Sequence, residues 1–307
     1  MLLIIFVLIA VTTRLLNGHN MMINRHSNTF EHNQALQYLL GAESMAKEAL
    51  HSDFITTGAN VDHLKEMWAE EIMPFELDEG GYLEAHVRDL NSCVNLNNVL
   101  SETGGDEYKT IKRLLINVGL PTEIEDLWRD WVDQDIEVAG LGAEDNEYAS
   151  GQYPYRTPNR LVTDFSEILL LRDMSFKHLT ILKKEACLIP ETNSQINVNT
   201  ASIEVLRALG EDMSLSMAEN LTQSVRAFKT PAEFLEAYPQ LQKSRNNIST
   251  KSTYFEMHAQ AKVGKTIVSM LSRIYRNPED GRVSVLRRDF GRLFRSKIRL
   301  ETETQEI

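Results

Sequence analysis

The first eleven residues of this 307-residue chain, Met1 to Val11, form an unbroken apolar run that constrains the fold more than any other feature. A full membrane span needs about 20 apolar residues, so the run is roughly half that length. No basic segment precedes it, and no small-residue cleavage motif follows Thr12 and Thr13. Three interpretations compete: a cleaved secretory signal, a buried core helix, and a membrane helix whose beginning is missing from this chain.

The helical pattern continues past the point where a signal peptide would end. Apolar residues recur at spacings of three and four: Ala35, Leu39, Ala42, Ala46 and Ala49, with Leu36, Leu40 and Leu50 beside them. No proline interrupts the pattern before Pro74. We therefore predict one long helix, membrane-inserted over residues 1–25 and amphipathic afterwards, whose second half packs on a globular head.

The charge and the cysteine content limit the partners and the compartment. The formal net charge is −12, and a chain this acidic would repel nucleic acid, because non-specific affinity depends on Lys and Arg. The two cysteines, Cys93 and Cys187, would be unrelated buried thiols in a reducing cytosol. In an oxidising compartment, one disulfide is the simpler interpretation.

The rest of the chain reads as strands, a helical block and strands again. Alternating apolar residues between Phe75 and Val87 surround a turn at residues 78–81, and the stretch from Thr253 to Val263 alternates cleanly. The predicted divisions are 26–105 for the amphipathic helix and first strands, 106–185 for an inserted helical domain, 186–250 for a further helical segment, 251–296 for the closing strands, and 297–307 for a charged tail. An α+β fold results, with a helical domain interrupting a small antiparallel sheet.

Motifs for catalysis are absent from the sequence. There is no nucleotide-binding glycine loop, no G-x-S-x-G nucleophile elbow and no H-E-x-x-H zinc motif, and the histidines are scattered. We therefore expect neither catalytic residues nor a small-molecule substrate, and interpret the chain as a non-enzyme.

The best candidate for a binding site is an acidic loop rich in glycine. Its carboxylates are Asp133, Asp135, Glu137, Glu144, Asp145 and Glu147. Ca²⁺ prefers six to eight oxygen ligands on a flexible, Gly-containing loop, although the spacing differs from that of an EF-hand. The alternative is an ordinary solvated acidic loop.

The segment from Ile196 to Leu209 resembles the start of helix-hairpin-helix DNA-binding modules, with Thr200 as the predicted N-cap. Those modules meet a phosphate with a Gly-rich hairpin. The matching stretch here, Gly210 to Ser214, has one glycine and two acidic residues. We interpret the segment as a helical packing unit without DNA binding.

Five phrases occur together in an order that resembles the type II secretion pseudopilin K family. They are DLNSCVNLN at 89–97, WVDQD at 131–135, GAEDNEY at 142–148, DFSEILLLRDM at 164–174 and INVNTA at 196–201. The resemblance implies a pilin-like fold with a large helical insertion, and bound calcium in the head. It also implies a subunit at the tip of a periplasmic pseudopilus, in complex with minor pseudopilins I and J, anchored by a single pass in the bacterial inner membrane.

Two departures from the common pilin pattern bear on this resemblance. The basic leader and its glycine processing site are not present, so Met1 is expected at or just inside the mature N-terminus. Other pilins carry a glutamate near the start of the mature helix, used for registration against the next subunit, whereas the first acidic residue here is Glu31. The K family also lacks that glutamate. A wide head and no registering carboxylate both suit the first subunit of a filament.

Two further expectations and two alternatives follow. In an oxidising periplasm, a Cys93–Cys187 disulfide would covalently link the two points where the insertion leaves and rejoins the sheet. The apolar residues Leu36, Leu39 and Leu40 are expected to bury against sister helices. The alternatives are a secreted or anchored calcium-binding domain with no assembly role, and a helix-hairpin-helix nucleic-acid-binding protein.

Overall fold

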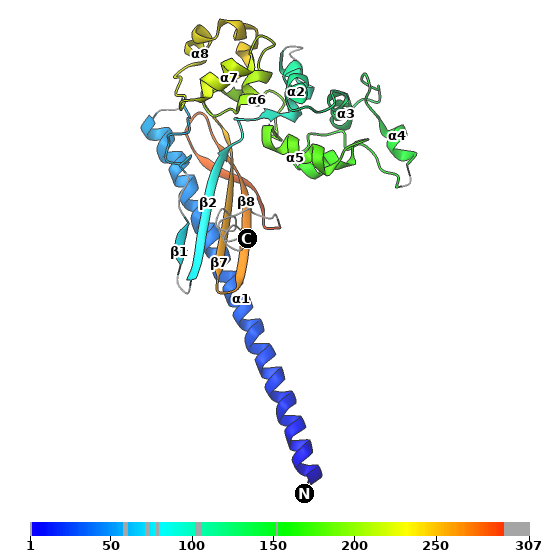
Figure 1. Ribbon diagram of the computed structural model, residues 1–307, viewed down its shortest axis with the longest axis vertical. Coiled ribbons are helices and arrows are strands. Elements are labelled where there is room, and N and C mark those ends of the chain that lie inside the picture. Colours follow the sequence, from blue (N-terminus) through cyan, green and yellow to red (C-terminus); the bar gives the residue numbers. More distant parts are fainter. Residues whose placement is uncertain are drawn as a thin grey trace.

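The computed structural model describes residues 2–57, 61–70, 74–77, 80–101, 106–151 and 153–291. A long N-terminal helix, an antiparallel sheet beside its upper half and a helical head above the sheet make up the molecule (Figure 1). The predicted α+β fold class, with a long helix packed on an antiparallel sheet, is confirmed. The predicted charged tail, 297–307, and residues 292–296 lie outside the described residues.

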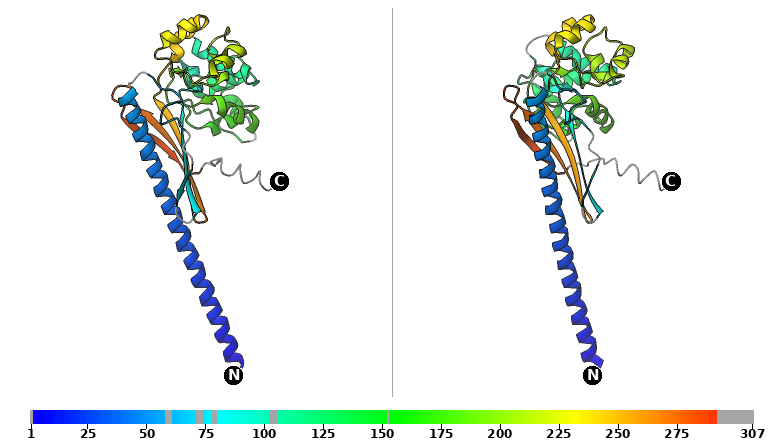
Figure 2. Two further views of the ribbon diagram at one scale, coloured as in Figure 1. Left: turned by 60° about the vertical axis from the view of Figure 1, so that its left-hand side comes forward. Right: turned by 90° about the vertical axis from the view of Figure 1, so that its left-hand side faces the viewer.

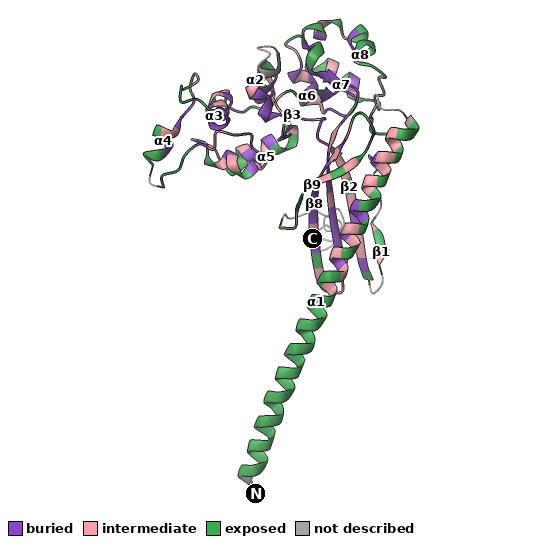
Figure 3. Ribbon diagram, turned by 180° about the vertical axis from the view of Figure 1, so that it is seen from behind, coloured by how far each residue is buried: buried purple, intermediate pink, exposed green. Residues whose placement is uncertain are grey.

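Helix α1 runs without a break from Leu2 to Thr57. Every described side chain from Leu3 to Phe30 is exposed, and this part of the helix extends away from the rest of the molecule (Figure 3). By its length and composition, α1 is able to cross a membrane. The interpretation as a buried core helix is wrong, because none of its most apolar window is buried within the chain.

Five strands form the main sheet, which lies along one side of the upper part of α1 (Figure 2). In sheet order they are β1 (Phe75–Leu77), β2 (Gly81–Asp89), β7 (Tyr254–Val263), β8 (Thr266–Arg276) and β9 (Val283–Asp289), all antiparallel. The alternation predicted from Thr253 to Val263 is β7, the central strand of the sheet. Its small and apolar side chains turn toward α1.

The core between α1 and the sheet is built around small side chains. Ala35 and Leu39 of α1 pack with Ala259 and Ala261 of β7, and the alanines let the helix approach the sheet closely. Leu39 is fully buried in this core, so its predicted place between sister helices is wrong. Leu36 and Leu40 are only partly buried, and Leu40 packs against the same core.

Polar contacts from α1 fix its register on the sheet. The Glu31 carboxylate accepts hydrogen bonds from the Lys265 backbone N–H, at 3.1 Å, and from the Thr266 hydroxyl, at 2.9 Å. Higher up, the buried Glu43 accepts from Ser272 at 2.6 Å and from two nitrogens of Arg288 at 2.7 and 2.8 Å. The β7–β8 turn of the sheet is therefore tied to the helix at Glu31, directly above the exposed stalk.

The whole stretch from Leu90 to Thr253 lies between two neighbouring strands, β2 and β7, so the insertion is longer than the predicted 106–185 and also contains 186–250. Its elements are β3 (Val94–Asn95), η2 (Leu96–Leu100), α2 (Asp106–Asn117), α3 (Glu123–Val132), α4 (Asp145–Ala149), η3 (Phe165–Leu170), α5 (Phe176–Glu185), β4 (Ala186–Cys187), β5 (Ile196–Asn197), α6 (Ile203–Ala208), α7 (Leu215–Thr222), α8 (Pro231–Ala237), η4 (Pro239–Asn247) and β6 (Ile248–Ser249). One continuous hydrophobic cluster joins its two predicted halves, which explains why the insertion forms a single unit.

Candidate metal centre

The predicted acidic loop begins at the end of α3 and ends at α4. Trp128 and Trp131 on α3 are almost completely buried and anchor that helix in the head. Asp133 is the C-cap residue of α3, and its backbone N–H donates to the Arg129 carbonyl at 2.9 Å. A rigid helix end therefore presents the first carboxylates of the loop.

Three of the six predicted carboxylates come together. One oxygen each from Asp133, Asp135 and Glu144 lies within 4.8 Å of the others. A fourth carboxylate, which the sequence analysis did not select, lies outside this 4.8 Å group but near enough to raise the pKa of Asp133 and Glu144: Asp130, fully buried on α3. Its Oδ1 accepts the Ala139 backbone N–H at 3.0 Å.

The other three predicted ligands lie outside this group. Asp145 accepts hydrogen bonds from the backbone N–H and the hydroxyl of Thr157, both at 2.8 Å. Glu147 pairs with Arg172, with contacts of 2.6 and 2.8 Å. Glu137 contributes its backbone N–H to Asp135, at 2.8 Å, and its carboxylate is not in the group.

Burial and mutual repulsion disfavour the charged forms of the grouped carboxylates. Burial, then the negative charges of Asp135 and Asp130, raise the pKa of Asp133 to about 6. Burial and the charges of Asp130 and Asp133 raise the pKa of Glu144 to about 7. Like charges in one site oppose ionisation, so this group is electrostatically unfavourable without a cation or protons.

Two glycines let the loop close over these carboxylates. Gly142 lies so near Asp130 that a Cβ there would collide with its carboxylate. Gly140 adopts a φ of +54°, and a Cβ would collide with Asp126. A side chain at either position would push the loop away from α3.

The donor set fits a hard divalent cation. Oδ2 of Asp130, Oδ1 of Asp133 and both carboxylate oxygens of Glu144 are buried and receive no hydrogen bond from the described residues. Buried carboxylate oxygens normally have partners, and oxygen-only ligands at a Gly-containing loop match Ca²⁺. Asp130, Asp133, Asp135 and Glu144 are the residues that would hold the ion.

A second buried acidic group has a different character. Asp53, Asp62 and Glu66 also lie close together, near the top of α1. Arg276 pairs with both aspartates, and its guanidinium lies 5.0 Å from the centre of the Phe255 ring. This group holds its own counter-charge, so we treat it as an ion-pair network that joins the helix to the sheet.

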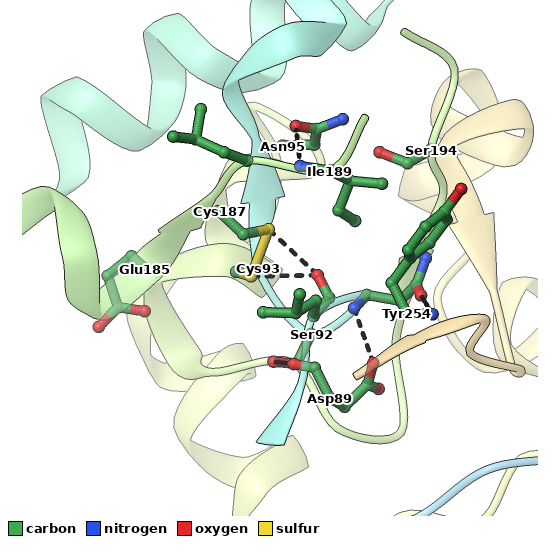
Figure 4. The surroundings of a disulfide bond; sticks show 12 residues. Asp89, Ser92, Cys93, Asn95, Glu185, Cys187, Ile189, Ser194 and Tyr254 are labelled. Carbon is green, nitrogen blue, oxygen red and sulfur yellow. Dashed lines mark hydrogen bonds between the residues drawn. A yellow bond between two sulfur atoms is a disulfide. The ribbon is translucent and has the colours of Figure 1, made fainter. Parts of the chain in front are cut away.

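Cys93 and Cys187 form a disulfide beside the start of the insertion (Figure 4). Their Cα atoms are 5.7 Å apart, and the parallel pairing of β3 with β4 brings them together. The sequence analysis expected the chain to rejoin the sheet near Cys187, and this is wrong. The chain rejoins the sheet at Tyr254, which packs against the disulfide. The bond ties the two ends of residues 93–187, and the later part of the insertion returns through the β5–β6 pair.

The segment that resembles a helix-hairpin-helix start has a different cap from the one predicted. Ser202 caps α6 by accepting the Val205 backbone N–H at 3.3 Å. Thr200 instead donates its hydroxyl hydrogen to Asp89, at 2.6 Å, in the junction between head and sheet. Asp89 is buried there and also accepts from Ser252 at 2.6 Å, so this phrase joins the insertion to the sheet.

Comparison with known proteins gives one consistent family. Two family models described as "Type II secretion system (T2SS), protein K" match residues 92–191 and 196–253. Similar proteins include the type II secretion system protein K of Pseudomonas aeruginosa, 32% identical over 305 residues, covering 94% of this chain and 90% of that protein. The protein of the same name from Klebsiella pneumoniae is 30% identical over 260 residues, covering 79% of this chain and 78% of that one.

A solved structure shares the fold. The crystal structure of the GspK-GspI-GspJ complex from the enterotoxigenic Escherichia coli type 2 secretion system contains a chain that matches with a TM-score of 0.76 at 27% identity. The match covers 88% of this chain and all of the other.

Proposed function

This chain belongs to the type II secretion system protein K family, and from that membership we propose that it is the minor pseudopilin at the tip of the type II secretion pseudopilus. It initiates pseudopilus assembly there, together with minor pseudopilins I and J, and so supports export of folded proteins across the outer membrane. The related crystal structure of a GspK-GspI-GspJ complex supports these partners.

The exposed stalk is the observation that carries this proposal. Every described side chain of α1 from Leu3 to Phe30 is exposed, and many of these side chains are apolar. The first part is long and apolar enough for a single pass through the inner membrane, and the head then lies in the periplasm. An exposed apolar residue above the span, Phe30, is available to neighbouring helices.

The tip position follows from the shape of the head and from Glu31. The insertion widens the head above the sheet, where a further subunit would have to stack (Figure 1). Residues 1–30 contain no acidic residue, and the Glu31 carboxylate already accepts hydrogen bonds from the β7–β8 turn. These residues of the stalk therefore offer no carboxylate for registration under a subunit above.

Co-purification tests this function directly. Full-length chain, co-expressed with minor pseudopilins I and J and extracted from membranes in mild detergent, should carry both partners through affinity purification. A Phe30→Lys variant should lose them while its head stays folded, and Asn33→Lys, an exposed polar position on the same helix, should keep them. Recovery of the chain as a soluble protein without either partner would favour the alternative of a calcium-binding domain with no assembly role.

We also propose that Asp130, Asp133, Asp135 and Glu144 bind one structural Ca²⁺ in the head. An ion that binds only the folded state stabilises it by mass action, by about 2.7 kcal/mol at a concentration 100 times Kd. The same ion would offset the repulsion that raises the pKa of Asp133 and Glu144. No catalytic step is assigned to it.

Thermal unfolding in calcium and in chelator tests the metal centre. The wild-type midpoint should fall on chelation, whereas an Asp133→Asn, Glu144→Gln variant should show no response to calcium. Because that variant also loses like-charge repulsion, its midpoint in chelator should equal or exceed that of the wild type. The matched control is Asp212→Asn, Glu219→Gln, which removes two exposed acids and should respond like the wild type. Identical wild-type curves in calcium and chelator would leave only a solvated acidic loop.

A further inference from the structure

The loop above the metal centre exposes three large aliphatic side chains. Ile136 is 81% exposed, Val138 59% and Leu141 63%. Single exposed apolar residues are common on protein surfaces, but three within six residues of one loop together expose an unusual amount of apolar area to water. We call Ile136, Val138 and Leu141 the aliphatic triad.

The backbone of this loop is held in place, so the triad is presented in a fixed arrangement. Alternate backbone N–H groups of the loop donate to carboxylates. Glu137 donates to Asp135 within the loop at 2.8 Å, and Ala139 and Leu141 donate to Asp130 and Asp126 of α3, both at 3.0 Å. Arg172 also donates to the Leu141 carbonyl, at 2.7 Å. A fixed apolar cluster loses less conformational entropy on binding than a mobile one.

Two of these carboxylates also belong to the metal centre. Asp130 holds the loop with Oδ1 and leaves Oδ2 without a hydrogen bond, and Asp135 both accepts the Glu137 N–H and lies in the metal group. An ion at the centre would fix the carboxylates that fix the loop. The arrangement of the triad is therefore coupled to occupancy of the metal centre.

The charge around the triad selects the kind of partner. Seven acidic residues of 123–147 are exposed or partly exposed, against Arg129 and the Arg172 that contacts Leu141, a formal charge of −5: Glu123, Asp126, Asp133, Asp135, Glu137, Asp145 and Glu147. One bound Ca²⁺ would leave this surface negative. A second copy of the same surface and an anionic membrane would both be repelled, whereas a cationic surface would be attracted.

We propose that the aliphatic triad and its acidic surround form a calcium-assembled docking surface for a protein partner that presents apolar side chains among Lys or Arg residues. The triad supplies the apolar contact, and the acidic residues around it favour a positively charged partner. The calcium dependence rests on the metal centre proposed above, whereas the surface itself does not depend on the pseudopilus assignment.

The probe for this surface is a short helical peptide made only of leucine and lysine, compared with a leucine–glutamate peptide of the same pattern. Binding to the full-length chain in uncharged detergent is measured by fluorescence anisotropy. The lysine peptide should bind at least about tenfold more tightly than the glutamate peptide. Replacing the triad by serine, which leaves the charge unchanged, should weaken lysine-peptide binding at least about tenfold, and chelation should do the same.

The matched control removes exposed apolar residues elsewhere on the head. An Ile116→Ser, Leu215→Ser variant should bind the lysine peptide like the wild type, since both side chains lie outside the acidic loop. Equal binding by wild type and triad variant would overturn the proposal, because the peptide would then respond to net charge alone. Binding to phosphatidylglycerol vesicles that requires the triad, without peptide binding, would overturn it in favour of a membrane. Co-purification with pseudopilins I and J, measured on the same variants, separates failure here from failure of the assembly function.

Discussion

The Cys93–Cys187 disulfide should contribute a large share of the stability of the head. The two cysteines are 94 residues apart in sequence, and both are almost fully buried. In the chain-entropy model, closing a loop of that length removes unfolded-state entropy worth about 4.7 kcal/mol at 25 °C. Domains are stable by only about 5–15 kcal/mol, so this bond is a large fraction of the total.

A Cys93→Ala, Cys187→Ala variant tests this magnitude. Urea unfolding of full-length chain in mild detergent, followed by circular dichroism, should show the head transition displaced by roughly 1.5 M, for an m value of ~3 kcal/mol/M. Wild type treated with reductant should unfold like the variant, and reductant should leave the variant unchanged. The single variant Cys93→Ala is the control for side-chain packing, and should match the double variant within about 1 kcal/mol.

Two outcomes would refute the reasoning. Two reactive thiols in unreduced, urea-unfolded wild type would show that the bond does not form in the cell. A displacement corresponding to less than about 1 kcal/mol would show that the oxidised bond is strained, or that the reduced chain keeps the same loop closed without it.

Three further predictions concern the core, the buried acids and the loop. Leu39→Ala should destabilise the packing of α1 on the sheet by about 2–5 kcal/mol in the same kind of unfolding assay, because Leu39 is fully buried in that core; a change below ~0.5 kcal/mol would contradict the observed packing. Burial, then the charge of Asp53, raises the pKa of Glu66 from 4.5 to about 7, so the folded state binds this proton more tightly than the unfolded chain does. The contribution of Glu66 to the free energy of unfolding should be present at low pH and fall by at most ~3 kcal/mol as pH rises from about 4.5 to 7. Glu66→Gln should remove this dependence of the unfolding free energy on pH, and an equal dependence in both proteins would contradict the prediction. Gly142→Ala should weaken calcium binding measured by titration calorimetry, because a Cβ would displace Asp130. Gly151→Ala, where a Cβ would make only an ordinary van der Waals contact, should not; equal affinities would contradict the close contact.

Periodic patterns predicted the elements well where one face of each element is buried. The alternation through Phe255, Met257 and Ala259 is strand β7, because those side chains face α1 while their neighbours face the other side of the sheet. The upper half of the N-terminal helix was predicted for the same reason, whereas its exposed lower part was predicted from the apolar run that begins the sequence. The pattern could not say what buries Leu39, since an apolar stripe looks alike whether it packs on the chain's own sheet or on a neighbouring helix.

The acidic loop shows why the ligand set was only partly predictable. Asp145 and Glu147 were selected because they are close in sequence to the other acids. The structure instead pairs them with Thr157 and Arg172, which lie 12 and 25 residues further along the chain. Asp130 was missed because it lies on a helix and not in the loop. One sequence signal indicated Asp130. It follows the buried Leu127 by three residues, which places an acidic residue next to the apolar face of the helix. Thr200 was misassigned as a cap because its partner, Asp89, is distant in sequence.

The position of the chain in the pseudopilus is the most direct test of its proposed function. Pseudopili sheared from a type II-secreting strain that carries an epitope in this chain, at the exposed residue Tyr153, should be labelled by gold-coupled antibody at one end only. A strain lacking the chain should form few or no pseudopili. Label spaced along the shaft, or pseudopili of normal number and length without the chain, would contradict a tip subunit that initiates assembly.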